Sequence, residues 1–283
     1  MSNTKRLFLF AGYDKNGVID DALVFYIREL SKCGDVILCM DSKCPKPELD
    51  KVKKHTIARM SVRHGEYDFG SYKRAYEYAK KHNILDNYDF VYVVNDSVYG
   101  PLHKLKPILE IMESYNTDAF GMTESKHTKY RHIQSWFMGM RKSVFKNDWF
   151  DKFIMGVEKQ PHKYLVTVLY ENKFTDLLEE NGGTWRCPFI CPGRSVYNNP
   201  KRLFRQGCPF IKKISFTRHN GAVGHQLYYV LKHCDKNAAH AIINGANHAY
   251  TSKYISWLLT PNPFVWFTRG IKYAIQKIKG INK

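Results

Sequence analysis

The polar segment Asn95-Asp96-Ser97 directly follows the strongest predicted strand of the chain, YDFVYVV at residues 88–94. A continuous apolar run of this kind is typical of a strand in the centre of a buried sheet. Ligands bind beyond the carboxyl ends of such strands, where Asp96 could hold Mg²⁺ or Mn²⁺ against a diphosphate and Asn95 could contact the cation or a sugar. The alternative is an ordinary turn, since Asn, Asp, Ser and the following Gly100-Pro101 all favour turns.

Two further polar loops could contact a nucleotide. Gly12-Tyr13-Asp14 follows the first expected strand and could hold a base or a ribose. Residues 63–73 form a compact loop that opens a helix, where glycines permit close backbone approach and the helix N-terminus attracts an anion. Asp68 and Lys73 in this loop could contact ribose and phosphate, and a simple capping loop is the alternative. The sequence contains no GxGxxG after a strand and no GxxxxGK[ST], so neither a dinucleotide fold nor a P-loop is supported.

Three candidates lie later in the chain. Alternation in His132-Ile133-Gln134-Ser135-Trp136 predicts His132, Gln134 and Trp136 on one face, which is typical of sugar recognition; the alternative is a core histidine beside a satisfied glutamine. Glu171, on an expected helix, is either solvated or, at a cleft, a proton acceptor for a hydroxyl group. His219 and His225 could reach a metal or a phosphate, or lie in a surface loop.

The elements that must position these residues alternate between strands and helices, which predicts an α/β sandwich with a largely parallel sheet. The region 183–262 is rich in turn-forming residues and is expected to be a loop-rich cover over the sheet. The expected strands are Leu7–Ala11, Asp35–Met40, Ile57–Val62, Tyr88–Val94, Ala119–Met122 and Ser135–Met140. The expected helices run from Asp20 or Asp21 to about Lys32, then over Gly70–His82, Lys104–Tyr115 and Lys163–Glu180.

Composition excludes a disordered chain, because 44% of the 283 residues are hydrophobic and 14% are aromatic. The net charge of +18 is uneven: residues 181–283 hold 16 basic side chains against the single acid Asp235, a net charge of +15. An anionic membrane, a phosphate-bearing substrate or nucleic acid could explain this excess. We expect no specific nucleic acid, because the sequence has no RNP, zinc-finger or helix-turn-helix pattern.

The basic C-terminal segment, 236–283, ends in a predicted amphipathic helix over about 264–280, preceded by a domain over 1–235. Such a helix can lie in a lipid headgroup layer, and the alternative is a terminal helix packed on the protein's own core. Its apolar stripe comprises Phe264, Phe267, Ile271, Ala274, Ile275 and Ile278. The basic residues mostly off that stripe are Arg269, Lys272, Lys277, Lys279 and Lys283.

The seven cysteines are odd in number and suggest no disulfide framework. Cys187, Cys191 and Cys208 could be interpreted as a zinc site, but buried thiols are the simpler interpretation. The N-terminal apolar run is too short for a signal peptide and no run is long enough to cross a bilayer. We therefore expect the chain in the cytoplasm.

Five segments follow one another along the chain in this order: EYDFGSYK, YDFVYVVNDSVYGP, DAFGMTES, HIQSWFMGMRKSVF and YENKFTDLLEENGG. Together they resemble the rhamnan synthesis protein F family of bacterial polysaccharide glycosyltransferases, over about residues 7–215. The combination of NDS-x-YGP with a later HxQS-aromatic-Phe is the specific part. The resemblance implies a GT-A-like Rossmann-type α/β/α sandwich with a mostly parallel central sheet, plus the basic helical tail.

The resemblance also implies roles for residues of this chain. It gives Glu171 and Asp96 catalytic roles, with Glu171 as the base, and it makes Asp96 a ligand of Mg²⁺ or Mn²⁺. His219, in the basic segment, is a further candidate ligand of the cation. His64 departs from the family pattern, which often has Asn at that position of the loop. The residues assigned to the nucleotide sugar are Ala11, Gly12, Tyr13, Asp68, Gly70, Lys73, Asn95, Asp96, Ser97, His132, Gln134 and Ser135.

The implied reaction moves rhamnose or another hexose from a dTDP- or UDP-linked donor to a hydroxyl of a lipid-linked polysaccharide, as in lipopolysaccharide or capsule synthesis, with inversion. Lys212, Lys213 and Arg218, or the cation, would stabilise the departing diphosphate. The protein would be peripheral to the inner face of the bacterial plasma membrane. A non-catalytic module that binds glycan or nucleic acid is the alternative.

Overall fold

The computed structural model of the chain describes residues 4–126, 131–217 and 221–279. The chain forms two compact units, each assembled from separate stretches of sequence. The first unit consists of Met1–Ile19, Tyr26–Asp96 and Leu105–Pro192, and the second of Asp20–Phe25, Ser97–Lys104 and Gly193–Lys283. The division into domains after residue 235 remains a prediction, and that position falls within the second unit.

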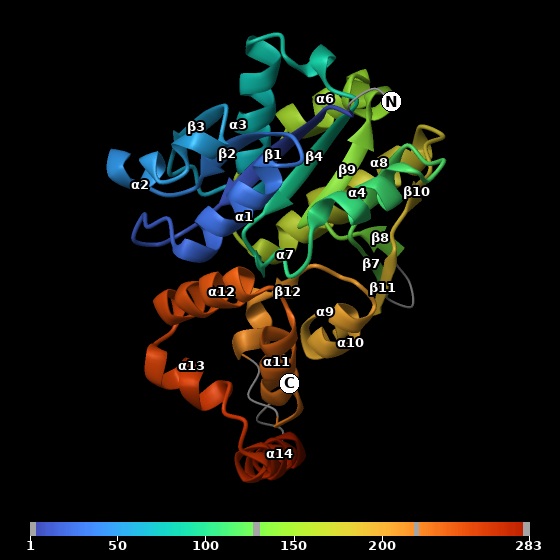
Figure 1. Cartoon of the computed structure of the whole chain (residues 1–283). Coiled ribbons are helices and arrows are strands. Elements are labelled where there is room, and N and C mark those ends of the chain that lie inside the picture. Colours follow the sequence, from blue (N-terminus) through green and yellow to red (C-terminus); the bar gives the residue numbers. More distant parts are fainter. Residues whose placement is uncertain (1–3, 127–130, 218–220, 280–283) are drawn as a thin grey trace. The chain divides into compact units, whose positions relative to one another are not determined.

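A seven-stranded sheet forms the centre of the first unit, with the strand order β10-β6-β9-β4-β1-β2-β3 (Figure 1). β1 pairs in parallel with β2 and β4, β2 with β3, and β10 with β6. β9 runs antiparallel between β4 and β6, so the sheet is mostly parallel, as predicted. The strand bounds are β1 Arg6–Gly12, β2 Asp35–Met40, β3 Ala58–Ser61, β4 Phe90–Asn95, β6 Ala119–Gly121, β9 Phe137–Arg141 and β10 Trp185–Arg186.

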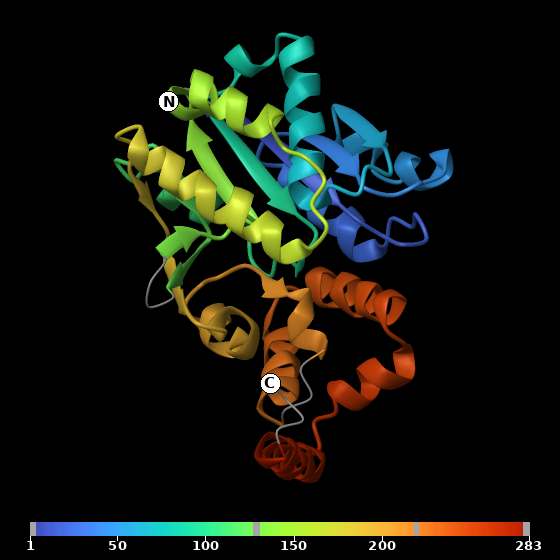
Figure 2. The same cartoon turned by 180° about the vertical axis from the view of Figure 1, so that it is seen from behind.

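Helices cover both faces of this sheet, which confirms the predicted α/β/α sandwich (Figures 1 and 2). Successive side chains of a strand point to opposite faces. Leu7 and Leu9 of β1 join one hydrophobic cluster, whereas Phe10 packs against Tyr26 of α1 on the other side, at 5.1 Å between ring centroids. The continuous apolar character of β1 and β4 is thus explained by burial on both faces.

The helices divide between the two faces. On one side lie α1 Asp21–Ser31 and α4 Leu105–Glu113. On the other lie α3 Tyr67–Lys81, α5 Lys142–Phe145, α6 Asp148–Met155, α7 Lys163–Val166, a π-helical segment Thr167–Asn172 and α8 Lys173–Glu180. The long helix predicted over Lys163–Glu180 is therefore continuous but widens in its middle. The first unit also contains the short helix α2 Lys46–Asp50 and the 3₁₀ turns Lys53–His55 and Leu85–Asn87.

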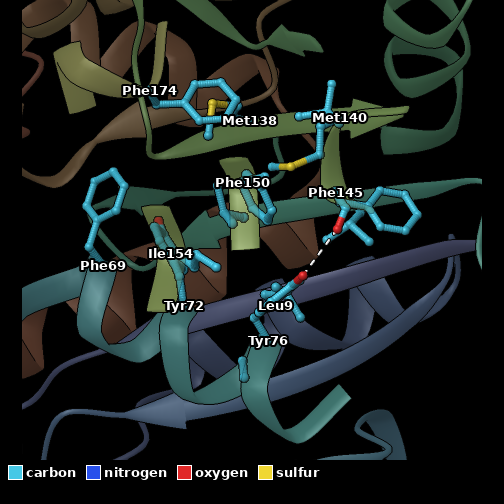
Figure 3. Close-up of a cluster of buried hydrophobic side chains, with 14 of the residues drawn as sticks. Leu9, Phe69, Tyr72, Tyr76, Met138, Met140, Phe145, Phe150, Ile154 and Phe174 are labelled. Carbon is cyan, nitrogen blue, oxygen red and sulfur yellow. Dashed lines mark hydrogen bonds between the residues drawn. The ribbon is translucent and has the colours of Figure 1, made fainter. Parts of the chain in front are cut away.

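Aromatic side chains fix the helices on the second of these faces (Figure 3). Tyr76 of α3 contacts Phe150 of α6 edge to face at 5.5 Å, and Phe69 of α3 contacts Tyr170 of the π-helical segment at 5.5 Å. The Tyr76 hydroxyl donates a hydrogen bond to the Phe145 carbonyl, 3.2 Å away. This packing holds together the two elements, α3 and the π-helical segment, that carry the candidate residues Asp68 and Glu171.

The first unit also contains a small second sheet that the sequence pattern does not predict. β7 Thr123–Lys126 pairs antiparallel with β8 Arg131–Ile133 and parallel with β11 Phe189–Pro192. These strands have three or four residues, so they carry too little apolar alternation to be recognised. The predicted strand Ser135–Met140 begins only at Phe137, because residues 134–136 form a turn between β8 and β9.

The second unit is largely helical in its described residues, so the expectation of a loop-rich cover over 183–262 is wrong. Small residues such as Ala238 and Ala246 pack inside it, and Asp235 caps α12 by accepting hydrogen bonds from the backbone N–H groups of Asn237 and Ala238. Its helices are α9 Ser195–Asn198, α10 Pro200–Arg205, α11 Gly221–His233, α12 Lys236–Ala249, α13 Ser252–Leu258 and α14 Pro263–Ile278. Two short strands, β5 Val98–Tyr99 and β12 Ile211–Lys212, pair antiparallel and precede a 3₁₀ turn at Lys213–Thr217.

A buried ion pair joins β1 to α4 and gives a test of the fold. Arg6 donates to both carboxylate oxygens of Glu113, at 2.5 and 2.6 Å, and the Tyr92 hydroxyl donates to the same carboxylate. We predict that Glu113→Ala lowers the free energy of unfolding by about 3–5 kcal/mol, because it leaves Arg6 buried without a counter-charge. Urea titration measures this loss. Glu110→Ala, which breaks only an exposed pair with Lys106, serves as the control and should change it by less than about 1 kcal/mol.

Candidate functional site

The strands β1, β2 and β4 end together, and polar side chains follow each of them. Asp96, directly after β4, donates its backbone N–H to the Ala11 carbonyl at 3.1 Å. Asp41, directly after β2, donates its backbone N–H to the Gly12 carbonyl at 2.8 Å. One carboxylate therefore lies on each side of the end of β1. The sequence analysis missed Asp41, although the signal that identified Asp96, an acid right after an apolar strand, applies to both.

Tyr13 presents an exposed ring beside Asp96. Its backbone N–H donates to Asp96 Oδ2 at 3.3 Å, and half of its surface is exposed. The guanidinium of Arg63 lies 4.9 Å from the centre of this ring, and Arg63 also donates to the Asp41 carbonyl at 2.7 Å. The end of β1 thus carries a flat aromatic surface with a cation on it, next to a carboxylate.

The side chains of Asp68 and Asn95 are in contact, as expected if both bind the same ligand. The Asn95 amide donates to Asp68 Oδ2 at 2.9 Å, and Asn95 is almost fully buried. Asp68 lies in the first turn of α3, where a negative charge is favoured by the helix dipole. Tyr67 before it has φ of 60°, a conformation that non-glycine residues rarely adopt. The turn that delivers Asp68 to the strand end is therefore strained.

Glu171 is neither solvated nor isolated. Its Oε2 accepts hydrogen bonds from the backbone N–H and the hydroxyl of Ser135, at 2.9 and 2.5 Å. Its Oε1 lies 3.3 Å from Nε2 of the buried His132. The residue belongs to the π-helical segment, and such segments are frequent at functional sites. The alternative that Glu171 is simply solvated is wrong.

The environment of Glu171 shifts its pKa in opposing ways. Burial disfavours the charged carboxylate and would raise the pKa, but the hydrogen bonds from His132 and Ser135 outweigh it. The net result is a pKa below the ordinary value of 4.5. Glu171 is therefore ionised at neutral pH. Tyr72 of α3 completes the arrangement by donating its hydroxyl to the Ser135 carbonyl at 3.0 Å.

Gln134 and Trp136 do not share a face with His132 in the way the alternation predicts. The Thr123 hydroxyl of β7 donates to Gln134 Oε1 at 2.7 Å and accepts from the Trp136 indole at 2.8 Å. Both side chains are therefore tied to the small sheet, whereas His132 pairs with Glu171. The cause is the turn over residues 134–136, in which the period of two that holds for a strand does not apply.

His64, the departure from the family pattern, is a packing residue in this structure. Its Nδ1 accepts from the Glu66 backbone N–H and its Nε2 lies 3.0 Å from the Ser71 hydroxyl. Burial of the ring lowers the pKa of His64, which keeps it neutral. Gly70 is required here, because a Cβ at that position would lie 2.8 Å from the His64 ring.

Other predicted site residues are held elsewhere. Lys73 donates to the Val157 carbonyl at 2.9 Å. A Cβ on Gly12 would lie 2.3 Å from Met40 Sδ, so that glycine serves the packing of the sheet. In the second unit, Lys212 donates to the Ser97 hydroxyl at 2.8 Å. Arg218 and His219 lie outside the described residues.

The described residues contain no group of three or more His, Cys, Asp or Glu side chains that could hold a metal ion. Cys187, Cys191 and Cys208 are buried free thiols. For Mg²⁺ or Mn²⁺, the segment directly after β4 supplies one carboxylate, Asp96. Such a cation commonly takes one or two protein carboxylates and completes its shell with phosphate oxygens and water, so Asp96 fits a cation that arrives with a diphosphate.

The seven-stranded sheet, parallel except for β9 and covered by helices on both faces, is an α/β/α sandwich of Rossmann type, as the sequence predicts. The chain matches the model of the family described as "Rhamnan synthesis protein F" over residues 36–265 and belongs to that family. No curated protein sequence matches it significantly. Among its described residues, no helix has both the length and the apolar character needed to cross a membrane.

Solved structures with a similar chain path include several glycosyltransferases. Another solved structure with a similar chain path is that of S. aureus TarS (residues 1–349), which is 9% identical, with a TM-score of 0.43 and coverage of 96% of this chain and 80% of that one. A glycosyltransferase involved in glycosylation of the major capsid of PBCV-1 is 10% identical, with a TM-score of 0.36 and coverage of 74% and 92%. Likenesses at this level describe the general path of the chain alone.

The lowered pKa of Glu171 predicts a pH-dependent contribution to stability. A carboxylate whose pKa is lower in the folded state stabilises above its unfolded pKa, and this contribution is lost as the pH falls through the folded value. We predict that Glu171→Gln lowers the free energy of unfolding by about 1–3 kcal/mol at pH 7, and that the difference from wild type shrinks below pH 4.5.

Urea titrations at a series of pH values measure this difference, with Glu110→Gln on the exposed face of α4 as the control. A difference that stays constant or grows as the solution is acidified would contradict a lowered pKa at Glu171.

Proposed function

We propose that the protein transfers rhamnose or another hexose from a dTDP- or UDP-linked donor to a hydroxyl group of a lipid-linked cell-surface polysaccharide. The observation that carries this proposal is Asp96 at the carboxyl end of β4, beside the exposed ring of Tyr13, in a chain of the rhamnan synthesis protein F family. The carboxylate suits a cation-bound diphosphate, and the ring suits a nucleotide base.

In this proposal, different side chains at the strand ends bind different parts of the nucleotide-sugar donor. The base stacks on Tyr13, whose ring already carries the guanidinium of Arg63, because bases and aromatic rings associate through their flat faces. Asp68 and Asn95, which are hydrogen-bonded to each other, are proposed to bind hydroxyl groups of the ribose or the sugar.

Asp96 would hold the cation, which neutralises charge on the leaving diphosphate. As the bond between the sugar C1 and the diphosphate lengthens, C1 develops oxocarbenium character. The acceptor hydroxyl then attacks C1 from the opposite side and inverts it.

Glu171 accepts the proton of the attacking hydroxyl in this scheme. Its lowered pKa ensures that it is ionised, and the same effect makes it a weaker base than an ordinary carboxylate. The proton therefore moves late, after bond formation to C1 has made the hydroxyl acidic. Of its contacts, the one between Oε1 and His132 is the longest, at 3.3 Å, so Oε1 is the oxygen that we propose as the acceptor.

Replacement of the carboxylate after β4 tests the catalytic assignment. We predict that Asp96→Asn lowers the rate of transfer by on the order of 100-fold or more, because it removes the charge opposite the diphosphate, while the melting temperature changes little. Release of UDP or dTDP in the presence of acceptor glycan measures the rate.

Asp176→Asn provides the matched control, since Asp176 is an exposed acid on α8, and its rate should equal that of the wild type. Wild-type activity in Asp96→Asn would refute the role of Asp96.

A thermal-shift screen tests the donor assignment separately from turnover. We predict that UDP or dTDP raises the melting temperature, and does so more strongly with Mg²⁺ or Mn²⁺, because a ligand of the native state stabilises it by mass action. Tyr13→Ala should reduce the shift, and the similarly exposed Tyr164→Ala should not. No shift with any nucleotide, together with a shift with oligosaccharide, would favour a non-catalytic glycan-binding module.

A further inference from the structure

The C-terminal helix α14 presents its apolar side to solvent. Five large side chains on it, spaced by three or four residues, are exposed: Phe264, Phe267, Ile271, Ile275 and Ile278. With about 3.6 residues per turn, they lie within roughly 80° of one another around the helix axis. The amphipathic helix predicted over about 264–280 corresponds to α14, Pro263–Ile278. Its apolar stripe faces solvent, while another side of the helix packs on α11, where the ring of Trp266 lies 5.2 Å from that of His225.

The opposite side of α14 is held by a buried arginine. Arg269 is only 5% exposed, and it points about 160° away from the middle of the stripe. Its guanidinium lies over the Trp257 ring at 3.8 Å and donates to the Leu258 carbonyl at 3.0 Å and to the Trp257 carbonyl. Burial lowers the pKa of Arg269. These bonds to α13 fix the rotation of α14 and keep the stripe outward.

This orientation of α14 is the opposite of the one expected for a helix whose outer side contacts water. A helix on the surface of a soluble protein normally buries its apolar stripe and exposes its arginines. Here a charged group is taken out of water while Phe264 and Phe267 remain 78% and 68% exposed. An exposed apolar face of this kind marks a surface that is covered by something else.

The charge around the stripe identifies what covers it. α14 contains Arg269, Lys272 and Lys277 and no acid, and no Asp or Glu follows Asp235 anywhere in the sequence. Lys272 and Lys279 are exposed on α14 and just after it. A second copy of this chain would bring like charges together, whereas an anionic lipid surface offers both phosphate groups for the lysines and an apolar layer for the stripe.

We propose that α14 lies in the plane of an anionic membrane surface, with its five exposed apolar side chains inserted below the headgroups and its lysines at the lipid phosphates. The inference goes beyond the proposed sugar transfer and does not depend on it. It would bring the protein to the surface where a lipid-linked acceptor is anchored, on a helix separate from the residues assigned to catalysis.

Sedimentation of the full chain with vesicles tests this proposal. We expect binding to vesicles of equimolar phosphatidylglycerol and phosphatidylcholine, weaker binding as salt is added, and little binding to pure phosphatidylcholine. The double variant Phe267→Ser with Ile271→Ser should weaken binding about tenfold or more, because it removes apolar surface from the stripe. Lys272→Glu and Lys279→Glu should each weaken it about fivefold or more.

Ile111→Ser is the matched control, because Ile111 is an exposed isoleucine on a helix of the first unit, and its binding should equal that of wild type. All of these side chains are exposed, so melting temperatures should be unchanged. Absence of binding to the mixed vesicles, or equal binding by the Phe267→Ser/Ile271→Ser variant, would overturn the proposal. So would a dimer in vesicle-free ultracentrifugation that this variant converts to monomer, since the stripe would then join two copies.

UDP or dTDP thermal shifts of the Phe267→Ser/Ile271→Ser variant should match those of wild type. Loss of vesicle binding with intact nucleotide shifts supports α14 as the membrane contact and leaves the sugar-transfer proposal to its own tests.

Discussion

The hydrogen bonds that join the end of β1 to its two neighbouring strands are the constraint on which the candidate site depends. The Asp96 and Asp41 backbone N–H groups bond to the carbonyls of Ala11 and Gly12, so the chain must leave all three strands at one edge. Parallel strands buried on both faces can shift only by breaking these bonds and moving side chains away from their helices. The register of the sheet therefore determines where the carboxylates stand, before any ligand is considered.

A second layer of constraint comes from the helices on one face. The contact of Tyr76 with Phe150 fixes α3 to α6, and the contact of Phe69 with Tyr170 fixes α3 to the π-helical segment. Because Asp68 and Glu171 are carried by these elements, the aromatic packing sets their positions relative to the sheet. The carboxylate of Glu171 in turn accepts hydrogen bonds from Ser135, in the turn over residues 134–136. The helical segment and the turn that leads into the sheet are therefore connected through this one carboxylate.

The sequence was sufficient for the features that depend on local pattern. The apolar runs of β1, β2 and β4 identified the sheet centre, because strands buried on both faces need no polar alternation. The segment NDS drew attention to Asp96 and Asn95. The element HxQS drew attention to His132 and Ser135 as residues near the sugar, but not to their contacts with Glu171. The α/β sandwich followed from the order of strands and helices, since few architectures accommodate that alternation.

What the sequence did not reveal depends on contacts between distant segments. Lys73 looked like a phosphate ligand, but its partner is a carbonyl 84 residues later. Gln134 and Trp136 are tied to Thr123 of a strand too short to recognise. Apart from α14, the helices between residues 195 and 258 were missed, in part because small residues such as Ala238 and Ala246 give a weak apolar pattern. The apolar stripe of α14 faces outward because Arg269 donates hydrogen bonds to the carbonyls of Trp257 and Leu258. The spacing of apolar residues in the sequence does not encode these bonds.

The interleaving of the two units in the sequence has a consequence for how the protein is made. β5, at Val98–Tyr99, pairs with β12, at Ile211–Lys212, and Lys212 comes 115 residues after Ser97. On the ribosome, therefore, β5 and β12 cannot pair until the whole of the first unit, which ends at Pro192, has been synthesised. No single cut in the chain separates the two units either, since each contains segments that lie between segments of the other.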